Sequence, residues 1–80
     1  MAVYKEPKYL EQSTSAEFDK DYSPGVATSF AGIYRCMGCH REIGIADGHT
    51  LPPQNHHSHT PAQGHIRWRL VVWADHNPKN

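Results

Sequence analysis

Hydrophobic and polar residues alternate most regularly near the C-terminal end of the chain, over residues 66–73 (IRWRLVVW). Successive side chains of a β-strand point to opposite faces of a sheet, so this alternation predicts a half-buried strand. The odd-numbered residues, which end at Trp73, are expected on the more exposed face. The even-numbered residues are expected on the buried face: Ile66, Trp68, Leu70 and Val72.

Two shorter apolar segments predict two more strands. Residues 30–35 (FAGIYR) lead into a turn that contains Cys36 and Cys39, and residues 41–45 (REIGI) follow that turn. Strands on either side of a short turn pair antiparallel. Together with residues 66–73, these segments predict a small, mostly-β fold with an antiparallel sheet of about three strands.

The rest of the chain predicts little regular structure. Thr14 and Glu17 have the spacing of a capping box, which predicts a short helix at residues 15–22, with an ordered loop as the alternative. Residues 1–12 are a polar arm, and residues 54–65 have no apolar periodicity and are expected to form a loop. The chain is therefore divided into an N-terminal arm with a short helix (1–28), a β domain (29–75) and a frayed tail (76–80).

Composition adds two constraints to this picture. The chain has 80 residues, with eight basic side chains, eight acidic side chains and seven histidines. Apolar burial contributes roughly 120 kcal/mol in a chain of this length, and ordering the chain costs about as much, so a further constraint such as a metal ion is expected. Zero formal charge argues against a strongly basic nucleic-acid-binding protein. No apolar run is long enough for a signal peptide or a membrane span, so we expect a cytoplasmic protein.

Cysteines and histidines are the candidate metal ligands. Two residues separate Cys36 from Cys39, and two thiolates with this spacing on one turn can occupy two corners of a tetrahedral zinc site. The pattern C-x2-C-x16-H-x2-H, which ends with His56 and His59, supplies the other two corners at the spacing of a zinc ribbon. His57 is a competing ligand, because His57 and His59 lie on one side of an extended segment. The sequence leaves open whether His56 or His57 pairs with His59.

Each of these residues also has a simpler interpretation. The two cysteines can instead be a redox pair or inert buried thiols, and the three histidines can belong to a solvated loop. His40 directly follows Cys39 and is expected to be exposed or to lie beside a ligand. The other histidines lack partner spacing and are expected to be ordinary surface residues: His49, His65 and His76.

Several stretches of the sequence resemble a family of small bacterial zinc-ribbon proteins: GIYRCMGC at 32–39, REI at 41–43 and GHTLPP at 48–53. In that family a Cys-x-x-Cys-Gly knuckle leads through a hairpin to Leu/Phe-Pro-Pro-Cys-Pro-x-Cys. Here His40 replaces the knuckle glycine, and Gln54 and His57 stand where the second cysteine pair is expected. The resemblance covers residues 24–73 and is stronger to a subgroup with the signature LPPQNHHxH, sometimes named protein L. It implies a zinc-ribbon-like fold and a zinc site, and no known activity.

A zinc site closed by four protein ligands has no open position for a substrate. We therefore expect a zinc-binding structural or interaction module and no enzyme; the alternatives are a metal-dependent enzyme, a thiol redox protein and a metal-free β domain. Its partner is expected to be a macromolecule other than a membrane, and zero net charge favours protein over nucleic acid. The side chains expected to contact it are Arg35, Arg41, Arg67, Arg69 and Trp73.

Overall fold

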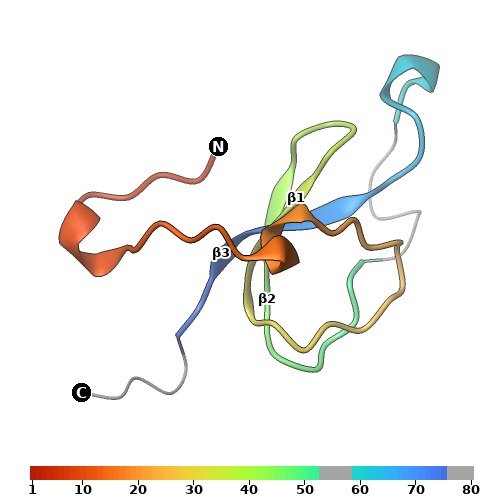
Figure 1. The fold of residues 1–80 in the computed structure, drawn as a ribbon. Helices are drawn as coiled ribbons and strands as arrows, with labels where there is room; N and C mark the ends of the chain where they lie inside the picture. The colour runs from red at the N-terminus through yellow and green to blue at the C-terminus, as the bar shows by residue number, and fades with distance from the viewer. Residues whose placement is uncertain (53–58, 76–80) are drawn as a thin grey trace.

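A three-stranded antiparallel sheet forms the centre of the molecule in the computed structural model, which describes residues 1–52 and 59–75 (Figure 1). Its strands are β1 (Gly32–Cys36), β2 (Glu42–Ile45) and β3 (Trp68–Trp73), and their order across the sheet is β2-β1-β3. Both pairings are antiparallel. The expected small, mostly-β fold with about three strands is therefore confirmed.

One face of the sheet carries the hydrophobic core. Cross-strand partners share a face, and Tyr34 on β1 lies opposite Ile43 on β2 and Leu70 on β3, while Cys36 lies opposite Trp68. The β1–β2 hairpin places Cys36 at the end of a strand and next to the turn. The fully or almost fully buried apolar side chains are Ala31, Tyr34, Cys36, Leu51, Ile66, Trp68 and Leu70.

A β-bulge in β3 changes which side chains face the core. Ile33 pairs with Val72 but Tyr34 pairs with Leu70, so Val71 is an extra residue with no partner on β1. One extra residue exchanges the faces of everything beyond it. The expectation that Val72 shares the buried face with Leu70 is therefore wrong. Trp73 instead pairs with Gly32 on the core side, where its ring meets the rings of Phe30 and Phe18 edge-on, with centroids 4.7 Å and 6.4 Å away.

Two loop segments, around Ala27 and Leu51, pair with each other and cover part of the core. Ala27 bridges Thr50, and the backbone of Leu51 bonds to that of Val26, which brings the Leu51 side chain into the core. Next to it the buried Tyr34 hydroxyl donates a 2.7 Å hydrogen bond to the carbonyl of Phe30. The same hydroxyl lies 2.6 Å from Thr28 Oγ1, which leaves the threonine as the donor of that bond. Burial raises the pKa of the Tyr34 phenol, and the hydrogen bond to Thr28 opposes part of this rise.

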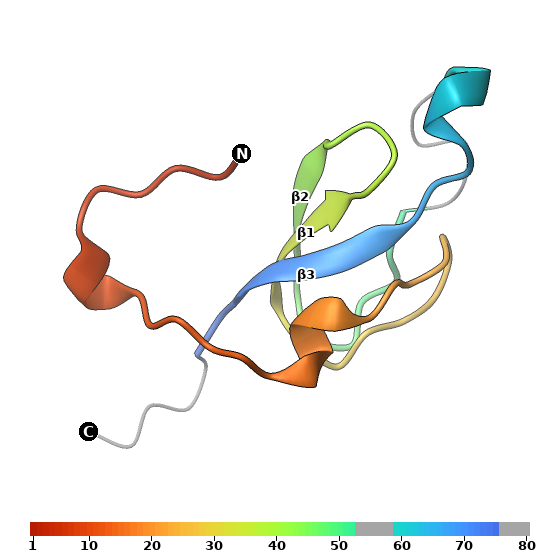
Figure 2. The ribbon, with the colours of Figure 1, turned by 45° about the horizontal axis from the view of Figure 1, so that its top comes forward.

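The N-terminal part of the chain contains two short 3-10 turns, η1 (Pro7–Tyr9) and η2 (Ala16–Asp19), of which η2 lies beside β3 (Figure 2). The helix expected at residues 15–22 is thus only one short turn, and its N-cap is Ser15, whose side chain accepts a bond from the Glu17 backbone. After η2, Tyr22 pairs with Trp68 on the outer edge of β3. Residues 1–14 are exposed throughout, and the tail at 76–80 lies outside the described residues. No helix in the described part of the chain is long and apolar enough to cross a membrane.

Candidate metal centre

The turn between β1 and β2 is a knuckle that holds the two cysteines. Cys36 ends β1, and its carbonyl accepts a 2.8 Å hydrogen bond from the backbone N–H of His40, which closes the turn around Cys39. The N–H of Cys36 donates to the carbonyl of Arg41 at 2.7 Å, which starts the return of the hairpin. His40 has φ 68°, a left-handed conformation that glycine adopts more easily than other residues. The residue after the second cysteine of the knuckle therefore has a conformation that favours glycine, and here that residue is a histidine.

A second loop brings His59 to this knuckle. It contains the 3-10 turn η4 (Pro61–Gln63), a short ordered element within the segment expected to be an irregular loop. The Gln63 side chain accepts a 2.8 Å bond from the Thr60 backbone, and Gly64 leaves the turn at φ 73°. Just before β3, the carbonyl of Arg67 accepts a 2.8 Å hydrogen bond from the backbone N–H of Met37 in the knuckle. This backbone hydrogen bond joins the knuckle to the segment that carries His59 and leads into β3.

Cys36, Cys39 and His59 form a cluster that can hold a metal ion. Their ligand atoms all lie within 4.8 Å of one another. His59 Nε2 is 3.4 Å from Cys36 Sγ. Bond lengths of about 2.3 Å for Zn–S and about 2.0–2.1 Å for Zn–N, at a tetrahedral angle, place these two atoms roughly 3.5 Å apart. The Cys36–His59 separation therefore fits one edge of a zinc tetrahedron.

The other nitrogen of His59 fixes its protonation pattern. Nδ1 lies 2.8 Å from the carbonyl oxygen of Gly64. A carbonyl oxygen only accepts hydrogen bonds, so Nδ1 carries the proton and donates it. Nε2 is then left with its lone pair directed toward Cys36, which is the form of neutral imidazole that binds a metal.

Gly38 makes this approach of His59 sterically feasible. A Cβ atom at residue 38 would lie 2.6 Å from the carbonyl oxygen of Gln63 and 2.7 Å from Cε1 of His59. Real Cβ atoms essentially never come so close to other atoms. Neither Gly38 nor Gly64 was among the predicted site residues, although a glycine between two closely spaced cysteines is a signal that another chain segment packs against the turn.

The predicted ligands are distributed as follows. The structure brings Cys36, Cys39 and His59 together, whereas His56 and His57 lie outside the described residues. Within residues 1–52 and 59–75, the cluster contains no other Cys, His, Asp or Glu. The expected surface histidines with described positions, namely His40, His49 and His65, are exposed.

Exposure differs among the three cluster residues. Cys36 is completely buried, whereas Cys39 and His59 are half-buried. Cys36 therefore joins the cluster to the hydrophobic core, whereas Cys39 and His59 keep partial contact with solvent. The described fold and cluster define a small β domain with a candidate Cys-Cys-His metal centre at one end of its sheet.

A curated protein of Escherichia coli named "Protein L" is 38% identical to this chain in an alignment 79 residues long that covers 94% of this chain and 90% of the relative. The chain therefore belongs to the family of that protein. The relative's name is the one used for the subgroup that the sequence resembles, and this name states no activity. No protein-family model matches the chain, and no solved structure matches it.

Proposed function

We propose that this protein is a small zinc-binding structural module that presents its β-sheet to a macromolecular partner, without enzyme activity of its own. Cys36, Cys39 and His59 supply three zinc ligands, and His56 or His57 supplies the fourth. The observation that carries the proposal is the orientation of His59, which has Nδ1 on the Gly64 carbonyl and Nε2 3.4 Å from Cys36 Sγ. A histidine held in this way by an outer carbonyl is characteristic of metal ligands.

The donor set favours zinc over other metals. Two thiolates and one or two imidazoles suit a tetrahedral zinc site, whereas calcium and magnesium require oxygen ligands. Zinc also provides the constraint that an 80-residue chain with little apolar core is expected to need. By joining the knuckle to the segment before β3, the ion stabilises the end of the sheet where all three strands meet their loops.

Two features support a structural role over the catalytic and redox alternatives. Cys36 is fully buried, so a substrate or an oxidising protein has no direct access to its sulfur. A redox Cys-x-x-Cys normally opens a helix within a β-α-β unit, whereas these cysteines flank a turn between two antiparallel strands. With only two cysteines in the chain, we place the protein in the reducing cytoplasm, where paired thiols serve as metal ligands.

The proposal is tested by measuring the metal content of the purified native protein by elemental analysis. Thiol groups are counted in parallel, with and without a chelator. We expect about one zinc ion per chain and two thiols that react with a thiol reagent only after the chelator is added. A metal-free protein with freely reactive thiols would overturn the proposal. Cobalt substitution provides a second readout, because tetrahedral thiolate coordination gives intense visible absorption bands.

A further inference from the structure

We propose that the face of the sheet opposite the core, at its knuckle end, binds an acidic segment of a partner protein through Arg35 and Arg67. This inference depends on the proposed function only because the metal holds the strands together at this end. We call the surface formed by Arg35, Arg67, Arg69 and Met37 the arginine face.

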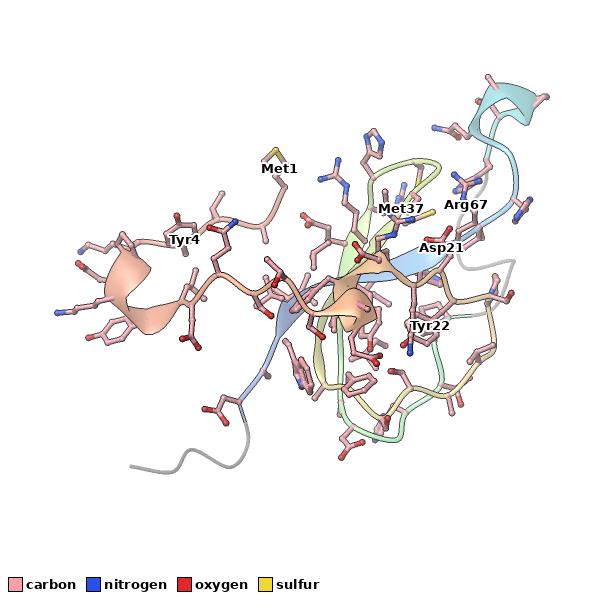
Figure 3. All side chains as sticks on the ribbon, in the orientation of Figure 1. Met1, Tyr4, Asp21, Tyr22, Met37 and Arg67 are labelled. Carbon is pink, nitrogen blue, oxygen red and sulfur yellow. The ribbon has the colours of Figure 1, made fainter. Side chains whose placement is uncertain are left out.

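Strand register places these side chains together. Cys36 and Trp68 point into the core, so Arg35 on β1 and Arg69 on β3, which pair directly, point to the opposite face. The next pair along the same face is Met37 and Arg67, whose backbones are joined by a 2.8 Å hydrogen bond. Figure 3 shows the Met37 and Arg67 side chains gathered at this end of the sheet, with Asp21 nearby.

Two of the three arginines on this face have no ion-pair partner among the described residues. Arg69 binds Asp21, with its Nε and one terminal nitrogen 2.9 Å and 2.7 Å from the same carboxylate oxygen. Neither Arg35 nor Arg67 forms an ion pair within residues 1–52 and 59–75. Residues 53–58 and 76–80 contain no acidic side chain that could supply one. Of these three guanidinium groups, only that of Arg69 is paired with a carboxylate in the part of the chain that the structure describes.

The arrangement is unfavourable for the isolated domain. Like charges directly opposite each other on adjacent strands destabilise a sheet, and Arg35 lies opposite Arg69. Glu42, the partner of Arg35 on β2, has its carboxylate 3.2 Å from the N-terminal amino group. An added carboxylate between Arg35 and Arg67 would relieve the repulsion and form charge-assisted hydrogen bonds with planar guanidinium groups.

Charge complementarity favours a protein segment over a nucleic acid. Asp21 and Glu42 flank the arginines on either side, so they would repel the continuous phosphate backbone of a nucleic acid. A peptide can place one or two carboxylates between these acids and an apolar side chain on Met37. The chain has zero net charge and thus lacks the long-range attraction on which nucleic-acid binding depends.

The test uses fluorescence anisotropy with three labelled probes and the intact protein as purified. The probes are a ten-residue peptide with four glutamates and two leucines, the same peptide with glutamine replacing glutamate, and a ten-nucleotide single-stranded DNA. We expect the glutamate peptide to bind more tightly than the other two, with an affinity that falls as salt rises. Equal binding of the glutamine peptide, or tighter binding of the DNA, would overturn the inference.

Single substitutions locate the binding surface. Arg35→Gln and Arg67→Gln should each weaken binding of the glutamate peptide about tenfold. Lys5→Gln, on the exposed arm, removes the same charge and should change nothing. Asp21→Asn should tighten binding, because it removes the carboxylate that competes with the peptide. Unchanged affinity in Arg35→Gln, Arg67→Gln and Asp21→Asn would overturn the inference.

Zinc content and far-ultraviolet circular dichroism are measured on each sample. If the wild-type protein holds zinc but does not bind the glutamate peptide, this inference fails while the proposed function stands. If the wild-type protein holds no zinc, the proposed function fails, and the arginine variants still decide the peptide-binding surface.

Discussion

Gly38 and His59 approach each other so closely that no side chain fits between them, since a Cβ on residue 38 would lie 2.7 Å from Cε1 of His59. The carbonyl oxygen of Gln63 also lies too close, at 2.6 Å from the same Cβ position. The knuckle and the loop before β3 are therefore packed together through a glycine, and the candidate metal centre depends on that contact.

Gly38→Ala should accordingly weaken zinc binding and reduce stability by about 1–3 kcal/mol, the usual cost of overpacking. Gly44→Ala is the matched control, because a Cβ there meets nothing within 4 Å and the residue lies in the exposed part of β2. That substitution should leave zinc affinity unchanged and raise stability slightly. Zinc competition with a chromophoric chelator compares the two variants, and equal affinities would show that the knuckle–loop contact does not shape the site.

His40→Gly should stabilise the protein by roughly 1 kcal/mol, because His40 has φ 68° and L-residues incur a penalty of this order in the left-handed region. Zinc affinity should not fall, since the His40 side chain is exposed and outside the cluster. His49→Gly serves as the control, because His49 has no positive φ and glycine there only increases the entropy of the unfolded chain. Denaturant unfolding that shows equal changes for both variants would contradict this interpretation of the turn.

Trp68→Ala should cost about 3–5 kcal/mol, the range found when a buried tryptophan site is emptied. Trp73 is 46% exposed, yet its ring packs on Phe30 and Phe18, so Trp73→Ala should cost an intermediate amount of about 1–2 kcal/mol. Urea unfolding of both variants checks this order. If Trp73→Ala had no effect, the aromatic contacts on the core side of β3 would be unimportant for stability.

Tyr34→Phe should destabilise the fold by about 1–3 kcal/mol at neutral pH, because it removes one hydrogen bond to the Phe30 carbonyl and leaves the buried Thr28 hydroxyl without its acceptor. Val72→Ala, on the other face of the sheet, is a useful reference for a small loss of apolar contact. A Tyr34→Phe variant as stable as wild type would contradict the assigned hydrogen bonds.

The same phenol gives the fold a pH dependence in the alkaline range. Burial raises the pKa of folded Tyr34 above its ordinary value of about 10. Its contribution to stability is therefore fully present below about pH 10 and is lost as the pH rises through the folded-state pKa. The difference in unfolding free energy between wild type and Tyr34→Phe should shrink between about pH 9 and pH 12. A difference that grows over this interval would contradict the direction of the pKa change.

Strand content could be predicted from the sequence because residues 41–45 and 66–73 alternate with the period of a strand and residues 30–35 are an apolar segment that leads into the cysteine turn. The bulge at Val71 could not be predicted, because nothing in the local sequence distinguishes a bulged valine from a paired one. The extra residue is set by how β3 pairs with Gly32. A Cβ at Gly32 would overlap the Val72 carbonyl, so this contact follows from tertiary packing rather than from alternation.

For the candidate site, spacing alone brought Cys36, Cys39 and His59 into one hypothesis, because short motifs on turns have few geometries. The roles of Gly64 and η4 required the fold, since they act on His59 through a backbone carbonyl that no side-chain motif reveals. The resemblance already places His40 where the family has glycine, but its left-handed conformation follows from closure of the knuckle on Cys36, which only the structure shows.

The central claim is that His59 completes a zinc site with Cys36 and Cys39, and its most direct test is the zinc affinity of His59→Ala. The matched control is His65→Ala, which removes an exposed histidine from the same chain segment. Competition with a chromophoric chelator should show that His59→Ala loses tight zinc binding while His65→Ala keeps the wild-type affinity. Wild-type affinity in His59→Ala, or loss of zinc in His65→Ala alone, would contradict the account.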